Sequence, residues 1–272
     1  MTIDLFLVRH AESCSNIQRA KNTDKNSTYR LGYNGVLHEP TLSIRGYIQT
    51  FQLRDYILKS KTLSYDKVIC SPLIRTVVTA MISLSTFNDE ENKNVIYIVP
   101  YVKIHTTKLS KINRVSELKD KIHNFKLWFH ISGIHLYQLY REKHSTKQVT
   151  TIHFPRIDYK ELEDYEHTFR ENERIQVTDQ FREYISRLNV SSLIIFTHKR
   201  FIMRVADISN EPKNSSITKI TVDTENETNR VTTHIYQPST NKHRITINRK
   251  YQIEQCNASK SFLTRTTRRK YR

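Results

Sequence analysis

The sequence predicts an α/β fold with an open sheet and a ligand site at one edge of that sheet. Three short apolar runs have the length and composition of buried strands, and they span residues 3–8, 65–70 and 192–197. Each run leads into a turn with polar side chains that suit a phosphate group, and segments with helical periodicity lie between the runs. Open α/β sheets bind ligands in the crevice beyond the carboxyl ends of their strands, so these turns mark the expected site.

Length and composition favour one elaborated domain. The chain has 272 residues, of which 37% are hydrophobic, enough to bury one substantial core. We predict a single domain over residues 1–258 with an insertion over about 105–170, followed by a basic tail over 259–272. No stretch approaches the ~18 consecutive apolar residues of a membrane helix. Residues 1–4 carry no charged leader, so neither membrane insertion nor secretion is expected.

Cysteine usage argues against a disulfide framework. The chain has three cysteines, Cys14, Cys70 and Cys256. An odd number this small does not make a disulfide framework for a fold of this size. This usage favours a reducing compartment, so we expect an intracellular protein, in the cytoplasm or the nucleus. We expect the three cysteines to be small buried apolar residues, because none has a partner at the spacing of a metal finger.

The chain is strongly basic. It has 44 Lys and Arg against 27 Asp and Glu, a formal net charge of +17. Such a field concentrates anions, and it favours phosphorylated substrates, nucleic acid or acidic membrane surfaces as partners. Six of the cations stand in the terminal tail: Lys260, Arg265, Arg268, Arg269, Lys270 and Arg272. Two interpretations of the tail stay open, a nucleic-acid or localisation segment and a frayed, solubilising end.

The first predicted strand carries Arg9 and His10 to the edge of the sheet. Residues 13–40 behind it are polar and rich in turn-forming residues, which predicts a loop over the site. Ser43 is a good N-cap for a helix that extends to about residue 59. Its apolar side chains recur at helical spacing: Ile44, Tyr47, Ile48 and Phe51.

The second strand, residues 65–70, precedes another helix. Pro72 falls in the first turn of that helix, where its missing N–H costs nothing. The apolar side chains behind it predict one buried face: Leu73, Val77, Ala80, Met81 and Leu84. A third strand is predicted at residues 95–99.

The middle of the chain is predicted to be helical, with an interruption at Gly133. Aromatic and aliphatic side chains follow helical spacing from residue 115 to about 142: Leu118, Ile122, Phe125 and Phe129. A later helix contains Val177, Phe181, Ile185 and Leu188 and leads into the strand at residues 192–197. Three terminal strands are predicted at residues 217–222, 231–236 and 245–253.

Four motifs that are separated in the sequence form one pattern. The first is the Arg-His-Ala-Glu-Ser opening at residues 9–13, and the second is Ser-Pro-x-x-Arg-x-x-x-Thr-Ala at residues 71–80. The third is the late strand that ends in His198, and the fourth is the Asn-Ser-Ser-Ile-Thr segment at residues 214–218. A Leu-Ser-x-x-Gly-x-x-Gln helix start at residues 42–49 adds a smaller match. Together these motifs resemble the histidine phosphatase superfamily, the phosphoglycerate-mutase-like enzymes, and the resemblance covers less than half of the chain.

The resemblance implies a three-layer α/β/α sandwich with a mostly parallel central sheet. It also implies a helical insertion over the active-site end of the sheet, for which the region 105–170 is the candidate. A cap that shapes substrate choice is the natural interpretation of this insertion. An ordinary pair of packing helices would have the same sequence pattern.

The resemblance also assigns catalytic roles. His10 would attack phosphorus and form a phosphohistidine, while Arg9 and Arg75 would hold the phosphoryl oxygens through their planar guanidinium groups. His198 would donate a further hydrogen bond to the same oxygens, and Asn16 would supply a neutral contact. Two guanidinium groups beside His10 favour its neutral, nucleophilic form. No metal and no cofactor are implied.

Two positions depart from the family pattern. Lys199 follows His198 where the family usually has Gly, which either tightens anion binding or points to solvent. Ile104 stands where many members have the Glu that protonates the leaving group. His105 could donate that proton, an acid of the insertion such as Glu117 or Asp158 could reach in, or the reaction could proceed without an acid.

The leading hypothesis from the sequence is a metal-independent phosphatase that acts on a phosphorylated small molecule or phosphoprotein. The alternative is a non-catalytic protein that keeps the fold and binds a phospho-ligand or nucleic acid. A phosphoglycerate mutase is disfavoured, because its reaction needs acid chemistry that the sequence lacks.

Overall fold

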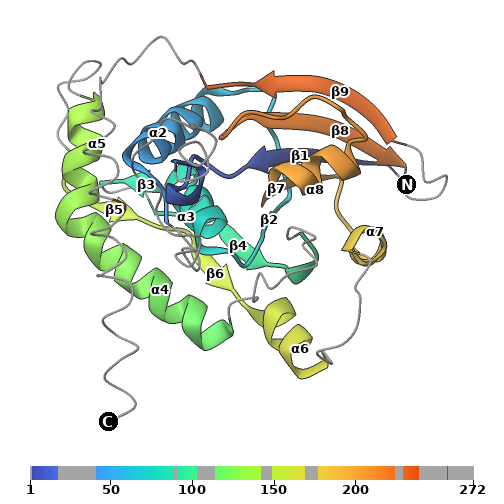
Figure 1. The fold of residues 1–272 in the computed structure, drawn as a ribbon, viewed down its shortest axis with the longest axis horizontal. Helices are drawn as coiled ribbons and strands as arrows, with labels where there is room; N and C mark the ends of the chain where they lie inside the picture. Colours follow the sequence, from blue (N-terminus) through green and yellow to red (C-terminus); the bar gives the residue numbers. More distant parts are fainter. Residues whose placement is uncertain are drawn as a thin grey trace, which may run out of the picture.

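A seven-stranded sheet forms the centre of the protein in a computed structural model (Figure 1). The structure describes residues 2–17, 41–88, 91–102, 114–141, 149–168, 177–223, 229–238 and 256. In spatial order the strands are β6 (Arg156–Asp158), β4 (Val95–Ile98), β2 (Lys67–Cys70), β7 (Ser192–Thr197), β1 (Thr2–Arg9), β8 (Ile217–Asp223) and β9 (Asn229–Tyr236).

The sheet is mostly parallel. The five strands from β6 to β1 run in one direction, whereas β8 pairs antiparallel with β1 and β9 pairs antiparallel with β8. Every residue of β7 is buried, as expected for a central strand covered on both faces. The predicted strands of the sheet are therefore confirmed within a few residues at each end, except the one at residues 245–253, which lies outside the described residues.

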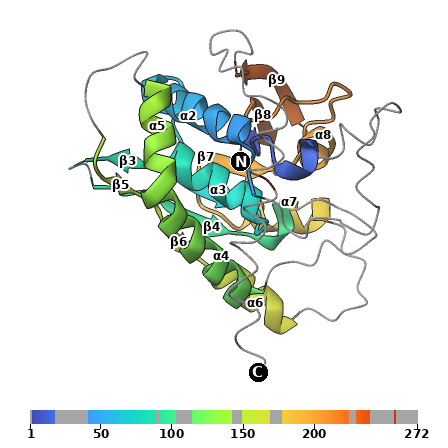
Figure 2. The same cartoon turned by 60° about the vertical axis from the view of Figure 1, so that its left-hand side comes forward.

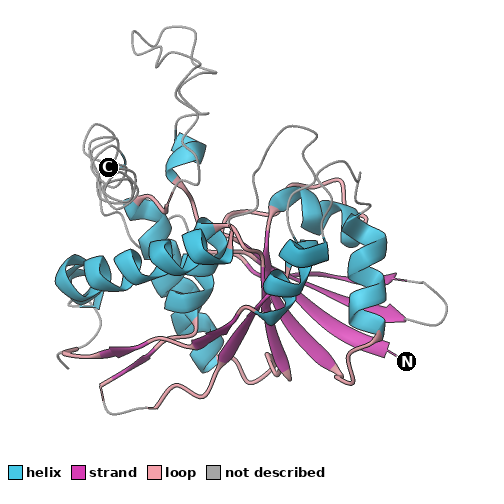
Figure 3. Cartoon of the chain, turned by 90° about the horizontal axis from the view of Figure 1, so that it is seen from below, coloured by secondary structure: helices cyan, strands magenta, loops and turns pink. Residues whose placement is uncertain are grey.

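Helices cover both faces of the sheet, which confirms the predicted three-layer α/β/α sandwich (Figure 3). One hydrophobic core contains side chains of α2 (Ile44–Lys59), α3 (Ile74–Ser83), α4 (Val115–Trp128) and α5 (Ile134–Arg141). The core on the opposite face contains side chains of α7 (Val177–Ser186) and α8 (Lys199–Val205). A 3-10 turn, η1 (Pro100–Val102), adds Val102 to this second core.

The start of α2 agrees with its predicted N-cap. The Ser43 hydroxyl oxygen accepts a hydrogen bond from the Gly46 N–H at 3.0 Å, which satisfies one of the free donors of the first turn. The helix ends at Lys59, as the apolar periodicity predicts.

The central region forms an almost continuous helical column of α4, the π-helical turn η2 (Phe129–Gly133) and α5, alongside α3 and α2 (Figure 2). Gly133, the predicted interruption, lies in the π turn. A Cβ atom there would come within 2.4 Å of the Phe129 ring, so the tight packing against this buried ring requires glycine. α4 packs against α3, and α5 packs against α2. α4 also pairs with α6 through Lys119 and Glu163, and a cap function stays a prediction.

Part of the predicted insertion belongs to the main sheet. Its strand β6 pairs parallel with β4 and is followed by α6 (Lys160–Thr168). A separate two-stranded sheet joins β3 (Thr86–Phe87) to β5 (Ile152–His153). The sequence predicted none of these elements. Residues 105–113, 142–148 and 169–170 of the insertion lie outside the described residues, as does the tail 259–272.

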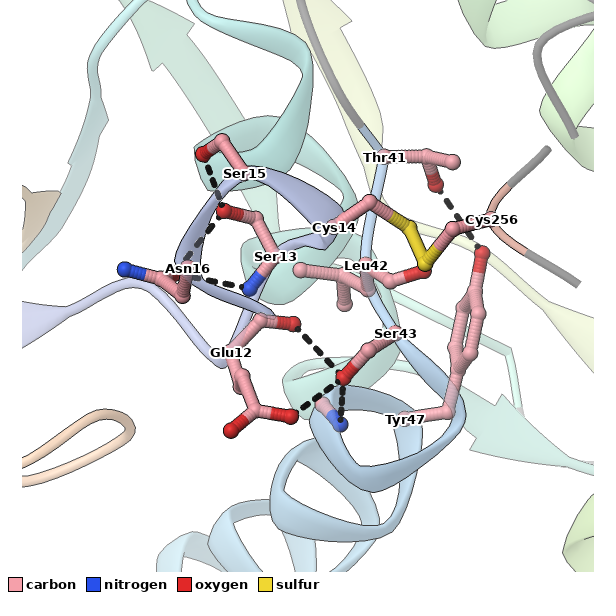
Figure 4. The surroundings of a disulfide bond; sticks show 11 residues. Glu12, Ser13, Cys14, Ser15, Asn16, Thr41, Leu42, Ser43, Tyr47 and Cys256 are labelled. Carbon is pink, nitrogen blue, oxygen red and sulfur yellow. Dashed lines mark hydrogen bonds between the residues drawn. A yellow bond between two sulfur atoms is a disulfide. The ribbon is translucent and has the colours of Figure 1, made fainter. Parts of the chain in front are cut away.

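One expectation about the cysteines is wrong. Cys14 and Cys256 form a disulfide with a Cα–Cα distance of 5.6 Å, although 242 residues separate them in the chain (Figure 4). The fold brings the two thiols together, which spacing in the sequence did not indicate. Cys70 is buried and free, as expected for a small apolar residue. No described helix has the length and hydropathy to cross a membrane.

Candidate active site

The register of neighbouring parallel strands brings the two predicted catalytic histidines together. Arg9 at the end of β1 is opposite Thr197 at the end of β7, so His10 and His198 occupy the next position along adjacent strands. The His10 N–H donates to the Thr197 carbonyl at 3.0 Å, which extends the ladder by one bond. The two imidazole rings meet edge to face with their centroids 5.2 Å apart.

The ring of His10 is oriented by the backbone. Its Nδ1 atom lies 2.7 Å from the Ala11 carbonyl oxygen. A carbonyl oxygen only accepts, so Nδ1 carries the proton of the neutral ring and Nε2 carries the lone pair. The side chain is almost fully buried at the sheet edge. This arrangement fixes the tautomer that a nucleophilic imidazole needs.

His198 is fully buried and lies among cations. Its Nε2 atom is 2.8 Å from the Ser71 hydroxyl and 3.4 Å from the Thr76 hydroxyl. Its Nδ1 atom is 3.5 Å from Nη2 of Arg75. Burial is the main reason that the pKa of His198 falls well below 6.5, and the charge of Arg75 adds to the effect. His198 is therefore neutral across the physiological pH range.

Arg9 is held from one side by the loop that follows α8. Its Nη1 atom donates to the Glu211 carboxylate at 2.9 Å and to the Pro212 carbonyl at 2.5 Å. Burial lowers the pKa of Arg9, and the Glu211 charge partly offsets this shift. The Nε atom of Arg9 is also buried, and it has no hydrogen-bond partner within the described part of the chain. A buried, unpaired guanidinium donor is costly and suits a site that receives an anion.

The same loop supports the backbone of both Arg9 and His10. The Asn214 side-chain amide donates to the His10 carbonyl at 2.9 Å. The Ser215 N–H donates to the Arg9 carbonyl, and the Arg9 N–H donates to the Ser216 carbonyl. Ser215 adopts φ 58°, a left-handed conformation that costs energy for a residue other than glycine. The fourth sequence motif thus lies directly against the first.

Further contacts join the first motif to α2. The Glu12 N–H donates to the Gln49 side chain at 2.8 Å, and the Ser43 hydroxyl donates to the Glu12 carboxylate at 2.7 Å. A Cβ atom at Gly46 would lie 2.0 Å from the Glu12 carbonyl oxygen. Gly46 is therefore required where the helix approaches the turn behind His10.

A single hydroxyl links the first motif to α3. The Ala11 N–H donates to the Thr79 hydroxyl oxygen at 3.1 Å, and that hydroxyl donates to the Arg75 carbonyl at 2.7 Å. This contact explains the Thr of the second motif. It fixes the helix turn that carries Arg75 relative to the turn that carries His10.

Asn16 lies in the short helical turn at residues 14–17, just after Cys14. Its side-chain oxygen accepts from the Ser13 N–H at 2.9 Å and from the Ser13 hydroxyl at 2.8 Å. Figure 4 shows its amide nitrogen pointing away from this turn. Cys14 belongs to the same turn, so the disulfide anchors the segment that carries Asn16.

The candidates from the sequence for protonating a leaving alcohol were His105, Glu117 and Asp158, beside Ile104 at the usual position of the acid. Ile104 and His105 lie outside the described residues. Glu117 is exposed on α4, and the Asp158 carboxylate accepts from the Lys160 N–H at 2.9 Å. The pKa of Glu211 is lowered, first by its hydrogen bond with Lys199, which makes this carboxylate a poor proton donor.

Sequence reasoning missed three residues that contact the predicted site: Ser71, Glu211 and Asn214. Ser71 and Asn214 stand inside recognised motifs, so the motifs themselves were the available signal. Glu211 lies in a polar loop with no periodicity or motif, and nothing in the sequence marked it. Lys199, whose role was open, pairs with Glu211 and is 39% exposed.

Comparison with known proteins gives modest matches. An α-ribazole phosphatase from Shigella flexneri is 15% identical, covers 86% of this chain and 96% of its own, and has a TM-score of 0.44. A mycobacterial glucosyl-3-phosphoglycerate phosphatase is 13% identical, with 86% and 98% coverage and a TM-score of 0.42.

Sequence comparison adds one relative, and no family model matches. An uncharacterized protein of Acanthamoeba polyphaga mimivirus is 28% identical over 130 residues, and the match covers 36% of this chain. The chain spans only 23% of the length of that relative.

Proposed function

We propose that this protein is a metal-independent phosphatase that hydrolyses a phosphomonoester or a phosphorylated protein through a phosphohistidine at His10. The observation that carries the proposal is the pair of buried imidazoles 5.2 Å apart, with a guanidinium nitrogen of Arg75 3.5 Å from the second ring. Four segments that are distant in sequence contribute to this cluster. A cationic cluster around an oriented imidazole suits phosphoryl transfer, in which charge is spread over three equatorial oxygens.

Binding of the phosphoryl group would use Arg9, Arg75, His198 and Asn16. The guanidinium groups supply charged, planar donors, and the unpaired Nε of Arg9 would gain its acceptor from a phosphoryl oxygen. His198 is neutral, so it donates through only one ring nitrogen. With phosphate bound, Nδ1–H of His198 would donate to an oxygen while Nε2 accepts from the Ser71 hydroxyl.

The chemical step would begin at Nε2 of His10, the ring nitrogen that carries the lone pair when Nδ1 donates to the Ala11 carbonyl. An N–P bond forms as the P–O bond to the leaving group breaks, and the leaving oxygen takes up a proton. Water then attacks phosphorus, releases inorganic phosphate and regenerates neutral His10. The displacement is thus divided into two easier steps, and both use the same anion-binding site.

The leaving group decides how much acid help the first step requires. Aryl phosphates and protein phosphohistidine have good leaving groups and need no strong acid. We therefore propose substrates of this kind before alkyl phosphates. The positive charge of the chain, +17, would favour approach of the phosphate dianion.

Hydrolysis of p-nitrophenyl phosphate in the presence of EDTA tests the proposal. The wild-type protein should release p-nitrophenol, and His10→Ala should lose about three orders of magnitude in kcat. His123→Ala, which changes an exposed histidine of α4, is the matched control and should keep wild-type activity.

Mapping the intermediate tests the mechanism itself. Acid-labile, alkali-stable labelling is expected on His10, and labelling of another residue would refute the mechanism. Binding of inorganic phosphate without turnover of any aryl phosphate would favour the non-catalytic alternative.

A further inference from the structure

The carboxylate of Glu211 lies between two cations of the proposed site. One oxygen accepts from Nη1 of Arg9 at 2.9 Å, and the other accepts from Nζ of Lys199. Glu211 is half exposed, whereas the Arg9 side chain is 9% exposed. A solvent-facing carboxylate therefore reaches into the site to hold a buried guanidinium.

This contact fixes one edge of the Arg9 guanidinium. Nη1 is occupied by Glu211 and by the Pro212 carbonyl at 2.5 Å. A planar guanidinium held at one nitrogen by two acceptors has little freedom to rotate. Its buried Nε, which has no partner among the described residues, is then kept in a constant direction.

Lys199 balances the negative charge of the Glu211 carboxylate. It follows His198 directly in the chain, so α8 begins with a cation beside the site. Its ammonium group pairs with the Glu211 oxygen that Arg9 does not use. An unbalanced carboxylate next to a bound phosphate dianion would repel it, and Lys199 reduces that repulsion.

We infer that Glu211 is a positioning residue that sets the direction in which Arg9 meets the phosphoryl group, with Lys199 as its counter-cation. The inference rests on the proposed function, because it assigns Arg9 to the phosphoryl group. It also explains why Lys is acceptable at a position where the resembled family usually has Gly.

The test measures KM and kcat separately, because a positioning role and a merely structural role predict different changes in these two constants. Glu211→Ala should raise KM for p-nitrophenyl phosphate about tenfold and change kcat by less than about threefold, because it weakens binding in ground and transition states alike. The Kd for inorganic phosphate, measured by titration calorimetry, should rise by the same factor. Glu211→Gln keeps an acceptor oxygen for Arg9, so we expect an intermediate effect.

Two further variants control the experiment. Glu163→Ala removes a carboxylate of similar exposure, 47%, from its pair with Lys119, 3.1 Å away, on the surface of α6. It should leave KM, kcat and phosphate affinity unchanged. Lys199→Ala should give an intermediate rise in KM, and Lys199→Arg should restore the wild-type value.

The outcomes are distinct for this inference and for the proposed function. If Glu211→Ala behaves like Glu163→Ala, or lowers kcat at unchanged KM, the positioning role is overturned while the phosphatase proposal stands. If the wild-type protein binds no inorganic phosphate and turns over no aryl phosphate, both are overturned. Should Glu211→Ala fail to fold, the Glu211→Gln and Lys199→Ala variants decide by the same split.

Discussion

His10 and His198 face each other across adjacent parallel strands, with ring centroids 5.2 Å apart and an interplanar angle of 63°. The pairing of β1 with β7 sets this distance, since each histidine follows directly after its strand. The rest of the site is arranged around this pair. Changes to the supporting contacts should therefore have effects that can be predicted from the geometry.

The close approach at Gly46 predicts a combined loss of stability and activity in Gly46→Ala. The added Cβ would lie 2.0 Å from the Glu12 carbonyl oxygen, so the turn behind His10 or the start of α2 must shift. We expect a loss of about 1–3 kcal/mol in the free energy of unfolding and at least about tenfold in kcat/KM.

Gly133→Ala serves as the comparison, because its Cβ would clash with the Phe129 ring in the helical column instead. It should lower the urea midpoint and leave kcat/KM of the folded fraction unchanged. Equal effects of the two variants on kcat/KM would contradict the prediction.

The depressed pKa of His198 predicts a pH-dependent stability. The folded protein resists protonation of His198, whereas the unfolded chain takes up a proton below about pH 6.5. The contribution is fully present above pH 6.5 and is lost as the pH falls toward the folded-state pKa. The free energy of unfolding should decline by up to about 1.4 kcal/mol per pH unit below 6.5.

Urea titrations between pH 5 and 7 measure this slope, and His198→Gln should reduce it. His130→Gln changes an exposed histidine of η2 and should keep the wild-type slope. A wild-type slope retained in His198→Gln would show that another group is responsible.

The hydrogen bond between Ser71 and His198 predicts that loss of the Ser71 hydroxyl affects phosphate binding through His198. Ser71→Ala leaves Nε2 of His198 without its 2.8 Å partner, so the buried ring loses a hydrogen bond that orients it. We expect about 1–2 kcal/mol lower stability and about five- to tenfold weaker binding of inorganic phosphate. Thr76→Val removes the longer, 3.4 Å contact and should have a smaller effect on phosphate affinity. The reverse order would contradict the assigned partners.

The disulfide predicts redox-dependent stability. Closing a loop between residues separated by 242 positions restricts the unfolded chain strongly, so Cys256→Ser should lower the free energy of unfolding by about 2–4 kcal/mol. Dithiothreitol should lower the wild-type urea midpoint and leave that of Cys256→Ser unchanged. A wild-type midpoint that does not respond to dithiothreitol would argue against the bond in solution.

The sequence predicted the elements with strong local signals. The buried run of β7, the periodicity of α2 and the break at Gly133 each follow from the residues of one segment. The short strands β3, β5 and β6 have only two or three residues, and their partners are distant in the chain. Strands of that length carry no periodicity, so only the assembled sheet defines them.

The same distinction between local signals and distant contacts applies to the residues of the site. Arg9 and His198 could be predicted because each stands where an apolar strand ends, and parallel strands end at the same edge of a sheet. The contact of Arg9 with Glu211 joins residues 202 positions apart, one of them in a loop without a pattern. The Cys14–Cys256 bond is a pairing of the same type, and parity arguments from three cysteines missed it.

A single connection, residues 211–216, touches the guanidinium of Arg9, its backbone and the carbonyl of His10. Substrate affinity, through Arg9, and the alignment of the attacking nitrogen, through His10, thus depend on the same six residues. Randomising this hexapeptide should yield variants whose two properties rise or fall together, which leaves little scope for adjusting either one alone.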